Sequence, residues 1–150
     1  MEEVYEPYPE RDDLDAFSRF QRAASLLLGE QVKIHRHFNK HWYIEYFGGG
    51  LEFYFVLFDP INEFEHPEGF CLDRPLIRII FFVVFPHGQG LGSQIMRLFI
   101  DQVRGTVFER IVLRARDDQA ARFWLHTGFT PSGESGLCMY QDLQLTESSI

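Results

Sequence analysis

The chain has 150 residues, of which 45% are hydrophobic and 24% charged, and its net charge is −8. These values are ordinary for a soluble globular protein and predict one domain over residues 1–150, because a chain of this length buries about 68–70% of its unfolded surface. The acidic balance argues against a nucleic-acid backbone as a partner, whereas it is compatible with a cationic substrate.

The apolar runs and the cysteines of the chain indicate in which cellular compartment the protein is expected. The longest apolar run, residues 79–86, is too short for a bilayer, which takes ~20 residues to span. The acidic residues 1–4 lack the apolar segment of a signal peptide. Cys71 and Cys138 lie far apart in the sequence and are expected to be free thiols. We therefore expect a cytoplasmic protein with no membrane association.

The first half of the chain combines one helical pattern with several extended ones. Apolar residues spaced three and four apart predict a helix that Asp12 and Asp13 cap and Gly29 ends. Alternating and aromatic-rich runs then predict three strands, the last two joined as a hairpin by a run of glycines. The strands are expected at 32–38, 41–47 and 51–58, the turn at 48–50, and a polar loop at 59–75.

The second half has the pattern strand, helix, strand, helix, hairpin. The run 76–85 has almost no polar residue besides Arg78, which predicts a strand covered on both faces. The order of elements predicts an α+β (mixed α/β) fold, with a mixed, mostly antiparallel sheet, one right-handed parallel crossover and flanking helices. Helices are expected at 93–104 and from an Asp117 cap to Gly128, strands at 110–115, 129–132 and 137–145, the last two as a closing hairpin.

A glycine-rich turn, residues 87–93, joins the expected strand 76–85 to the helix after it. The first N–H groups of a helix lack partners and carry a partial positive charge, which suits a phosphate or pyrophosphate. Gly88, Gly90 and Gly92 alternate with other residues, so the backbone can approach such a group without a Cβ atom in the way. The same glycines also fit an ordinary tight turn, so the flanking sequence has to decide.

Two segments together resemble the GNAT superfamily of acyl-CoA-dependent N-acyltransferases. VFPHGQGLG at 84–92 is similar to the family's pyrophosphate loop, usually Gln/Arg-x-x-Gly-x-Gly/Ala after a central strand. DDQAARFWLHTGF at 117–129 has the spacing of its Asn-x-x-Ala-x-x-x-Tyr-x-x-x-Gly-Phe segment, and LCMYQDL at 137–143 is similar to the last strand of that fold. The resemblance covers residues 76–145, and before them it extends only to the order of elements.

This resemblance implies a GNAT-like sheet and the transfer of an acetyl group from acetyl-CoA to a primary amine by direct attack, with no metal. The N–H of Val84, near the splayed end of the central strand, is expected to donate to the thioester oxygen, and one such donor is typically worth ~10²–10³ in rate. The residues expected to bind acetyl-CoA, mainly through backbone N–H groups, are Val84, His87, Gly88, Gln89, Gly90, Leu91, Gly92, Ser93, Asp117 and Trp124.

Three positions depart from the family pattern. His87 stands where Gln or Arg is usual, and Asp117 replaces Asn. Trp124 occupies the position of the Tyr that often protonates the departing thiolate, and an indole N–H is no acid at neutral pH. Since a thiol of pKa ~8.5 leaves fairly well unprotonated, the loss weakens catalysis without preventing it. Tyr140 is a candidate substitute acid, although an ordinary strand aromatic fits this position at least as well.

A base matters more, because an amine of pKa ~10.4 is seldom neutral at pH 7. The strand 76–85 contains no acid. The expected direction of the strands brings the turns at 48–50 and 133–136 to the glycine-turn end of the sheet. Glu45, Glu52 and Glu134 are therefore the candidates to bind or deprotonate the amine, and each also fits a plain surface carboxylate.

Several alternatives remain open. His35, His37 and His41 fit surface histidines better than a metal site, so no metal is expected. A non-catalytic acyl-CoA-binding module would suit Trp124. A Rossmann-type dinucleotide oxidoreductase gains from Asp117 but loses because an antiparallel region precedes the glycine turn. The acceptor could be a small amine, an aminoglycoside, a peptide N-terminus or a protein lysine, and a homodimer is compatible with the sequence.

Overall fold

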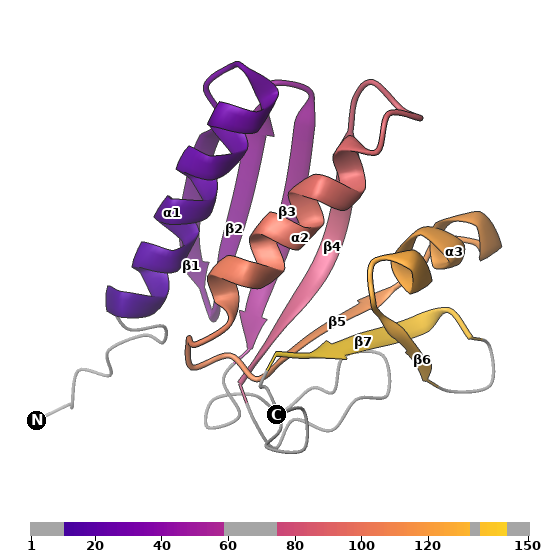
Figure 1. The fold of residues 1–150 in the computed structure, drawn as a ribbon. Helices are drawn as coiled ribbons and strands as arrows, with labels where there is room; N and C mark the ends of the chain where they lie inside the picture. Colours follow the sequence, from indigo (N-terminus) through magenta and orange to yellow (C-terminus); the bar gives the residue numbers. More distant parts are fainter. Residues whose placement is uncertain (1–10, 59–74, 133–135, 144–150) are drawn as a thin grey trace, which may run out of the picture.

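The computed structural model describes residues 11–58, 75–132 and 136–143, with side chains from residue 14 onward. Within these residues the chain forms three helices and seven strands (Figure 1). Their order and bounds are α1 (Arg11–Leu28), β1 (Lys33–Asn39), β2 (His41–Gly48), β3 (Leu51–Phe58), β4 (Leu76–Val84), α2 (Leu91–Val103), β5 (Arg110–Arg114), α3 (Asp118–His126), β6 (Thr130–Ser132) and β7 (Cys138–Asp142). None of the described helices is long and apolar enough to cross a membrane.

All seven strands belong to one sheet, in the order β1-β2-β3-β4-β5-β7-β6. β4 and β5 run parallel, and every other neighbouring pair is antiparallel. The expected α+β fold with one parallel strand pair is therefore confirmed. The dinucleotide alternative is wrong, because it requires an open parallel sheet.

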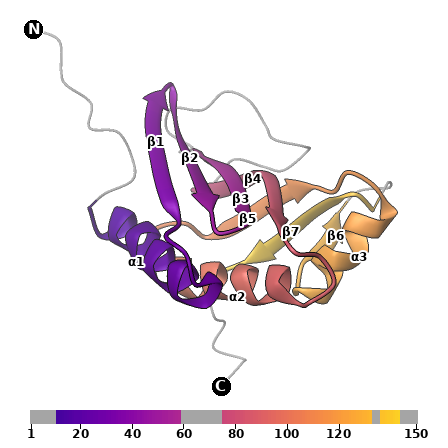
Figure 2. The same ribbon diagram turned by 90° about the horizontal axis from the view of Figure 1, so that it is seen from above.

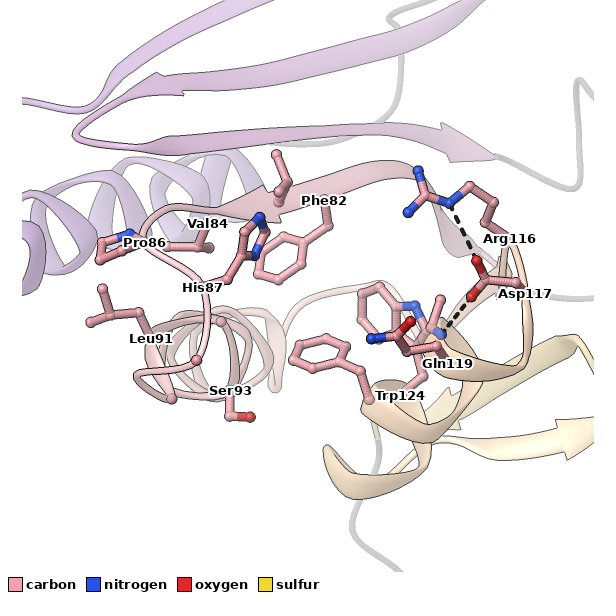
Figure 3. A pocket seen from close by; sticks show the side chains of 16 residues that line it. Phe82, Val84, Pro86, His87, Leu91, Ser93, Arg116, Asp117, Gln119 and Trp124 are labelled. Atoms are coloured by element: carbon pink, nitrogen blue, oxygen red, sulfur yellow. Dashed lines mark hydrogen bonds and ion pairs between the residues drawn. The ribbon is translucent and has the colours of Figure 1, made fainter.

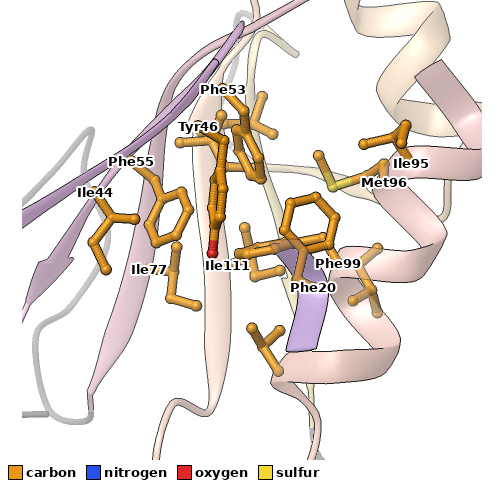
Figure 4. Close-up of a cluster of buried hydrophobic side chains, with 14 of the residues drawn as sticks. Phe20, Ile44, Tyr46, Phe53, Phe55, Ile77, Ile95, Met96, Phe99 and Ile111 are labelled. Carbon is orange, nitrogen blue, oxygen red and sulfur yellow. The ribbon is translucent and has the colours of Figure 1, made fainter. Parts of the chain in front are cut away.

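The three helices lie on one face of the sheet, as Figure 2 shows. Between them and the strands is an aromatic core (Figure 4). Phe99 of α2 packs against Phe20 of α1 and Phe53 of β3, with ring centroids 5.2 Å and 4.8 Å apart. Tyr46 of β2 is also fully buried there, and its hydroxyl donates a 2.9 Å hydrogen bond to the carbonyl of Phe17. Burial raises the pKa of Tyr46 well above the usual value.

The opposite face of the sheet, which we call the helix-free face, holds a smaller apolar cluster around Val56, Phe58, Leu76 and Val112. The expectation that strand 76–85 is covered on both faces is wrong for its second half, where Ile80 and Phe81 are each 45% exposed. The reason is that all three described helices pack on the other face, so the apolar run has no described helix over this side.

Some boundaries also differ from the expected ones. α1 runs from Arg11, the first described residue, so Asp12 and Asp13 lie within the helix, whereas they were expected ahead of it. α2 begins at Leu91, two residues before the expected start at Ser93. The Asp117 cap of α3 is confirmed, since the Asp117 carboxylate accepts a 2.8 Å hydrogen bond from the N–H of Ala120. The expected loop up to residue 74, with Cys71, and the candidate Glu134 lie outside the described residues.

Candidate functional site

β4 and β5 separate toward their carboxyl ends. Their parallel pairing runs from Leu76 opposite Arg110 to Ile79 opposite Leu113. At that point the register between β3 and β4 shifts, and Ile80 is an extra residue in β4. Such a bulge bends its strand and increases the local twist. β4 then continues five residues beyond Ile79, to Val84, whereas β5 ends one residue beyond Leu113, so a gap opens between the two strands.

The backbone of Val84 faces this gap. The N–H of Phe85 donates a 2.9 Å hydrogen bond to the carbonyl of Gly50, on the β3 side of β4. Successive N–H groups of a strand point to opposite edges. From Phe81 to Val84 the register with β3 is regular, so the N–H groups of Val84 and Phe82 point toward β5, past the end of their shared ladder.

The glycine turn follows directly and leads into α2. Gly88 and Gly90 have φ angles of +81° and +74°, in the left-handed region that favours glycine. Gly90 caps α2, no side chain caps the helix, and the N–H of Gln94 donates to the Gly90 carbonyl (3.1 Å). The N–H groups of the first helical turn before Gln94 are therefore left for a ligand or for water, as an anion site requires.

A cavity of about 400 Å³ lies between the glycine turn and α3 (Figure 3). It brings together the two segments that the sequence analysis singled out, although some 25 residues separate them. Of the residues expected to bind acetyl-CoA, all but Gln89 line it. The described residues that line it are Phe82, Val83, Val84, Pro86, His87, Gly88, Gly90, Leu91, Gly92, Ser93, Arg116, Asp117, Gln119, Ala120, Phe123 and Trp124.

Aromatic rings form one wall of the cavity. Trp124 is only 7% exposed, and its ring lies 5.7 Å from that of Phe82, 5.0 Å from Phe123 and 5.1 Å from Phe129. Gly92 belongs to this wall as well, because a Cβ atom there would lie 3.3 Å from the Phe123 ring. The third glycine of the turn thus allows α2 to pack against α3, which is a different role from that of Gly88 and Gly90.

His87 and the charged pair Arg116 and Asp117 stand on opposite sides of the cavity (Figure 3). His87 is exposed and packs edge-on against Phe85, with centroids 4.4 Å apart. At the α3 end, the Arg116 Nε lies 3.8 Å from the Asp117 Oδ2, at the protein surface. Sequence reasoning missed Arg116, along with Gln119 and Phe123. Arg116 had one available signal, since a cation next to a helix cap beside an expected anion site is a natural ligand.

The described candidate acids and bases, Tyr140, Glu45 and Glu52, lie on the helix-free face and do not line the cavity. Tyr140 pairs with Val112, level with the closed part of the parallel pair, and the Arg110 guanidinium lies 4.5 Å from the centre of its ring. Glu52 is the cross-strand neighbour of Val83, which does line the cavity. Glu45 lies one strand further away, opposite Tyr54.

Two further groups of side chains lie on the helix-free face, one around Tyr54 and one around His37. Burial raises the pKa of Tyr54, and the nearby Tyr43 and Glu45 raise it further, so its hydroxyl stays protonated and can only donate or accept a hydrogen bond. His37 stacks on Tyr43 at 5.1 Å, with His35 at 6.3 Å from His37. Within the described residues no group of three or more His, Cys, Asp or Glu side chains is arranged to hold a metal ion.

Comparisons with known proteins give similarity in structure only. No family model matches the sequence, and no curated protein matches it. The structure of Tetrahymena GCN5 has a TM-score of 0.50 at 16% identity, over 89% of this chain and 85% of that one. yncA from Salmonella typhimurium, a putative acetyltransferase solved with acetyl-CoA, has a TM-score of 0.44 at 18% identity, over 90% and 76% of the two chains.

A further similar structure is that of a KacTA–DNA complex, with a TM-score of 0.49 at 13% identity, over 86% of this chain and 80% of that one. The expectation that this chain binds no nucleic acid stays a prediction from its charge. The strand order, the single parallel pair and the similarity to GCN5 agree on the architecture. The chain has the fold of the GNAT acetyltransferases.

Proposed function

We propose that the protein transfers the acetyl group of acetyl-CoA to a primary amine by direct attack. The observation that carries this proposal is the Val84 N–H, which points into the gap between β4 and β5 beside the cavity that joins the glycine turn to Trp124. A backbone donor at a strand opening, next to an uncapped helix start, fits a thioester whose other end carries a pyrophosphate.

Binding of acetyl-CoA is assigned to the backbone of residues 88–93 at the start of α2. The N–H groups of the first helical turn and the partial positive charge of the helix supply the attraction for the pyrophosphate. Arg116, at the far end of the cavity, adds a cation to the same lining. His87 contributes little in this scheme, because its ring packs on Phe85 at the surface.

In the chemical step the amine nitrogen attacks the thioester carbonyl, the C–N bond forms, and the C–S bond breaks. The Val84 N–H stabilises the negative charge that develops on the carbonyl oxygen. The ammonium form of the acceptor first loses one proton to become nucleophilic, and the nitrogen loses a second to solvent after the C–N bond forms. Glu52, as the cross-strand neighbour of Val83, is the nearest described carboxylate of the candidates to accept the first. In such pairs the Cβ atoms lie about 5 Å apart. The thiolate leaves without help from Trp124, whose indole is no acid.

A non-catalytic acyl-CoA-binding module remains the second candidate, and one observation favours it. Among the described residues, the only carboxylate in the cavity lining is Asp117, which caps α3 and lies next to Arg116. The described part of the lining therefore supplies neither the usual acid nor a free base.

Two measurements separate the candidates. Calorimetry with acetyl-CoA tests binding, and release of free thiol from acetyl-CoA across a panel of amines tests turnover. The panel contains small amines, an aminoglycoside, peptides with a free N-terminus and a lysine peptide. Binding with thiol release that depends on the amine supports the transferase. Binding without release from any amine supports the module, and no binding contradicts both.

A further inference from the structure

We propose that Trp124, together with Phe82, closes the acyl end of the cavity and restricts the transferred group to acetyl. This inference rests on the proposed function and deepens it, since it names the acyl group that the site accepts. It starts from the departure at position 124, where this chain has an indole in place of the smaller phenol that the resemblance led us to expect.

The position of the acyl group follows from the backbone of β4. A thioester oxygen that accepts from the Val84 N–H lies at the β5 edge of β4, in the gap beyond Ile79. One pleat back along the same strand is Phe82, about 6.6 Å away at 3.3 Å per residue. The side chain of Phe82 meets Trp124 there, with ring centroids 5.7 Å apart. An acyl chain that extends from the carbonyl toward Phe82 therefore runs into a pair of rings.

The wall that these rings form is fixed in place. Trp124 is 7% exposed and has rings against it from three elements or their ends: Phe82 of β4, Phe123 of α3 and Phe129 just after α3. Phe82 is in turn held edge-on by Phe53 of the core, at 5.1 Å. Protein interiors are close-packed, so the indole cannot move aside for extra methylene groups without breaking these contacts.

The expected selectivity is large for a small change in the substrate. One additional methylene in an apolar pocket changes kcat/KM by ~10–200-fold. We expect propionyl-CoA to react about tenfold more slowly than acetyl-CoA, and butyryl-CoA or hexanoyl-CoA about a hundredfold or more. Because the wall acts on binding as well as on turnover, the dissociation constants of the four acyl-CoAs should follow the same order.

Replacing the indole tests the wall directly. Trp124→Leu should bring the kcat/KM and the dissociation constant of butyryl-CoA to within about threefold of those of acetyl-CoA, because the freed volume takes about two methylene groups. Trp124→Phe removes less volume and should move the preference part of the way. The matched control is Trp42→Leu: Trp42 is the other tryptophan of the chain, lies on β2 against the same core, and does not line the cavity. It should keep the wild-type preference.

The outcomes separate this inference from the proposed function. The inference that Trp124 limits the acyl group is wrong, while acetyl transfer stands, in either of two cases. In the first, the wild type has the same kcat/KM for hexanoyl-CoA as for acetyl-CoA. In the second, folded Trp124→Leu and Trp124→Phe both retain the acetyl preference. A change of preference in Trp42→Leu equal to that in Trp124→Leu would also overturn it, since the effect would then come from loosening the core. If no acyl-CoA binds or reacts, the proposed function fails and the inference fails with it.

Discussion

Trp124 bears on whether the leaving thiolate is protonated, because it stands in place of a tyrosine able to donate a proton. If the indole is only a wall, Trp124→Phe should retain most of the turnover of acetyl-CoA. Trp124→Tyr adds a hydroxyl to the same ring and should have a kcat at least equal to that of Trp124→Phe. The gain should reach at most about 100-fold, the lower end of what a general acid contributes. Steady-state kcat for the two variants, which differ by one oxygen atom, measures that factor.

Tyr140 provides the complementary experiment. It lies on the helix-free face beside Arg110, level with the closed part of the β4–β5 pair. Tyr140→Phe should therefore leave kcat within about threefold of the wild-type value, an effect smaller than the loss of a general acid. A collapse of kcat with the fold intact would show instead that Tyr140 protonates the thiolate.

Tyr46 makes a stability prediction that depends on pH. Tyr46→Phe removes the hydrogen bond that the hydroxyl donates to the Phe17 carbonyl, and should lower the free energy of unfolding at pH 7 by about 0.5–1.5 kcal/mol. Because burial raises the pKa of Tyr46 in the folded state, the unfolded chain loses this proton first as the pH rises. The contribution of the hydroxyl is therefore fully present below the unfolded pKa of ~10 and declines above it.

Urea titrations of wild type and Tyr46→Phe at pH 7, 10 and 11 measure this decline. The difference in unfolding free energy between the two proteins should shrink as the pH rises above 10. A constant difference across this range would mean that the hydroxyl is not the group responsible.

At the scale of elements, the start of α2 carries the binding of acetyl-CoA. Gly90 caps the helix at a φ of +74° with no atom within 4 Å of a Cβ placed there. Gly90→Val both strains this turn and puts a branched side chain over the open N–H groups, so acetyl-CoA should bind at least 30-fold more weakly, on the order of a lost anion site. His87→Ala should change the dissociation constant by less than about threefold, since backbone groups make the contacts.

Gly105 is the matched control for Gly90. It has a φ of +85°, a Cβ atom added to it would also have no other atom within 4 Å, and it lies beyond the other end of α2. Gly105→Val should therefore cost a similar backbone strain without weakening the binding of acetyl-CoA. Equal losses in the two glycine variants, measured by calorimetry on proteins of checked folding, would remove the glycine turn from the site.

The elements that could be predicted are those with a local signal. Spacing of apolar residues and glycines gave all three helices and the strands to within a few residues, and the two motifs gave most of the cavity lining. The bulge at Ile80 could not be seen, because an unbroken apolar run contains no sign of a register shift. Phe82 and Phe123 become neighbours in one cavity only after β4 and α3 pack together, so no spacing along the chain could indicate that both line it.

At the scale of the whole molecule, the sheet separates two different environments. On one side the helices bury an aromatic core, and the cavity opens at its edge between α2 and α3. On the other side the described residues include the exposed Glu45 and Glu52 and the half-buried Tyr54, near the end at which β4 leaves β5. An acceptor that approaches from the helix-free face would reach the gap beside Val83 without passing the glycine turn. A cationic amine suits this approach, given the net charge of −8.

The register between β3 and β4 turns this arrangement into a prediction about the two carboxylates. Glu52 adjoins Val83, whereas Glu45 is one strand further from the gap. Glu52→Gln keeps the shape of the side chain and removes its charge, and should lower kcat/KM for the amine by about 10²-fold, as expected for loss of a general base, with little change in the binding of acetyl-CoA. Glu45→Gln, the same change on the same face, should lower kcat/KM by less than about fivefold through weaker attraction of the amine.

Glu52→Gln should also regain part of its activity as the pH rises toward the pKa of the acceptor, because more of the amine is then neutral without help. If Glu45→Gln loses more activity than Glu52→Gln, or if neither variant shows the recovery at high pH, the amine is deprotonated elsewhere in the molecule.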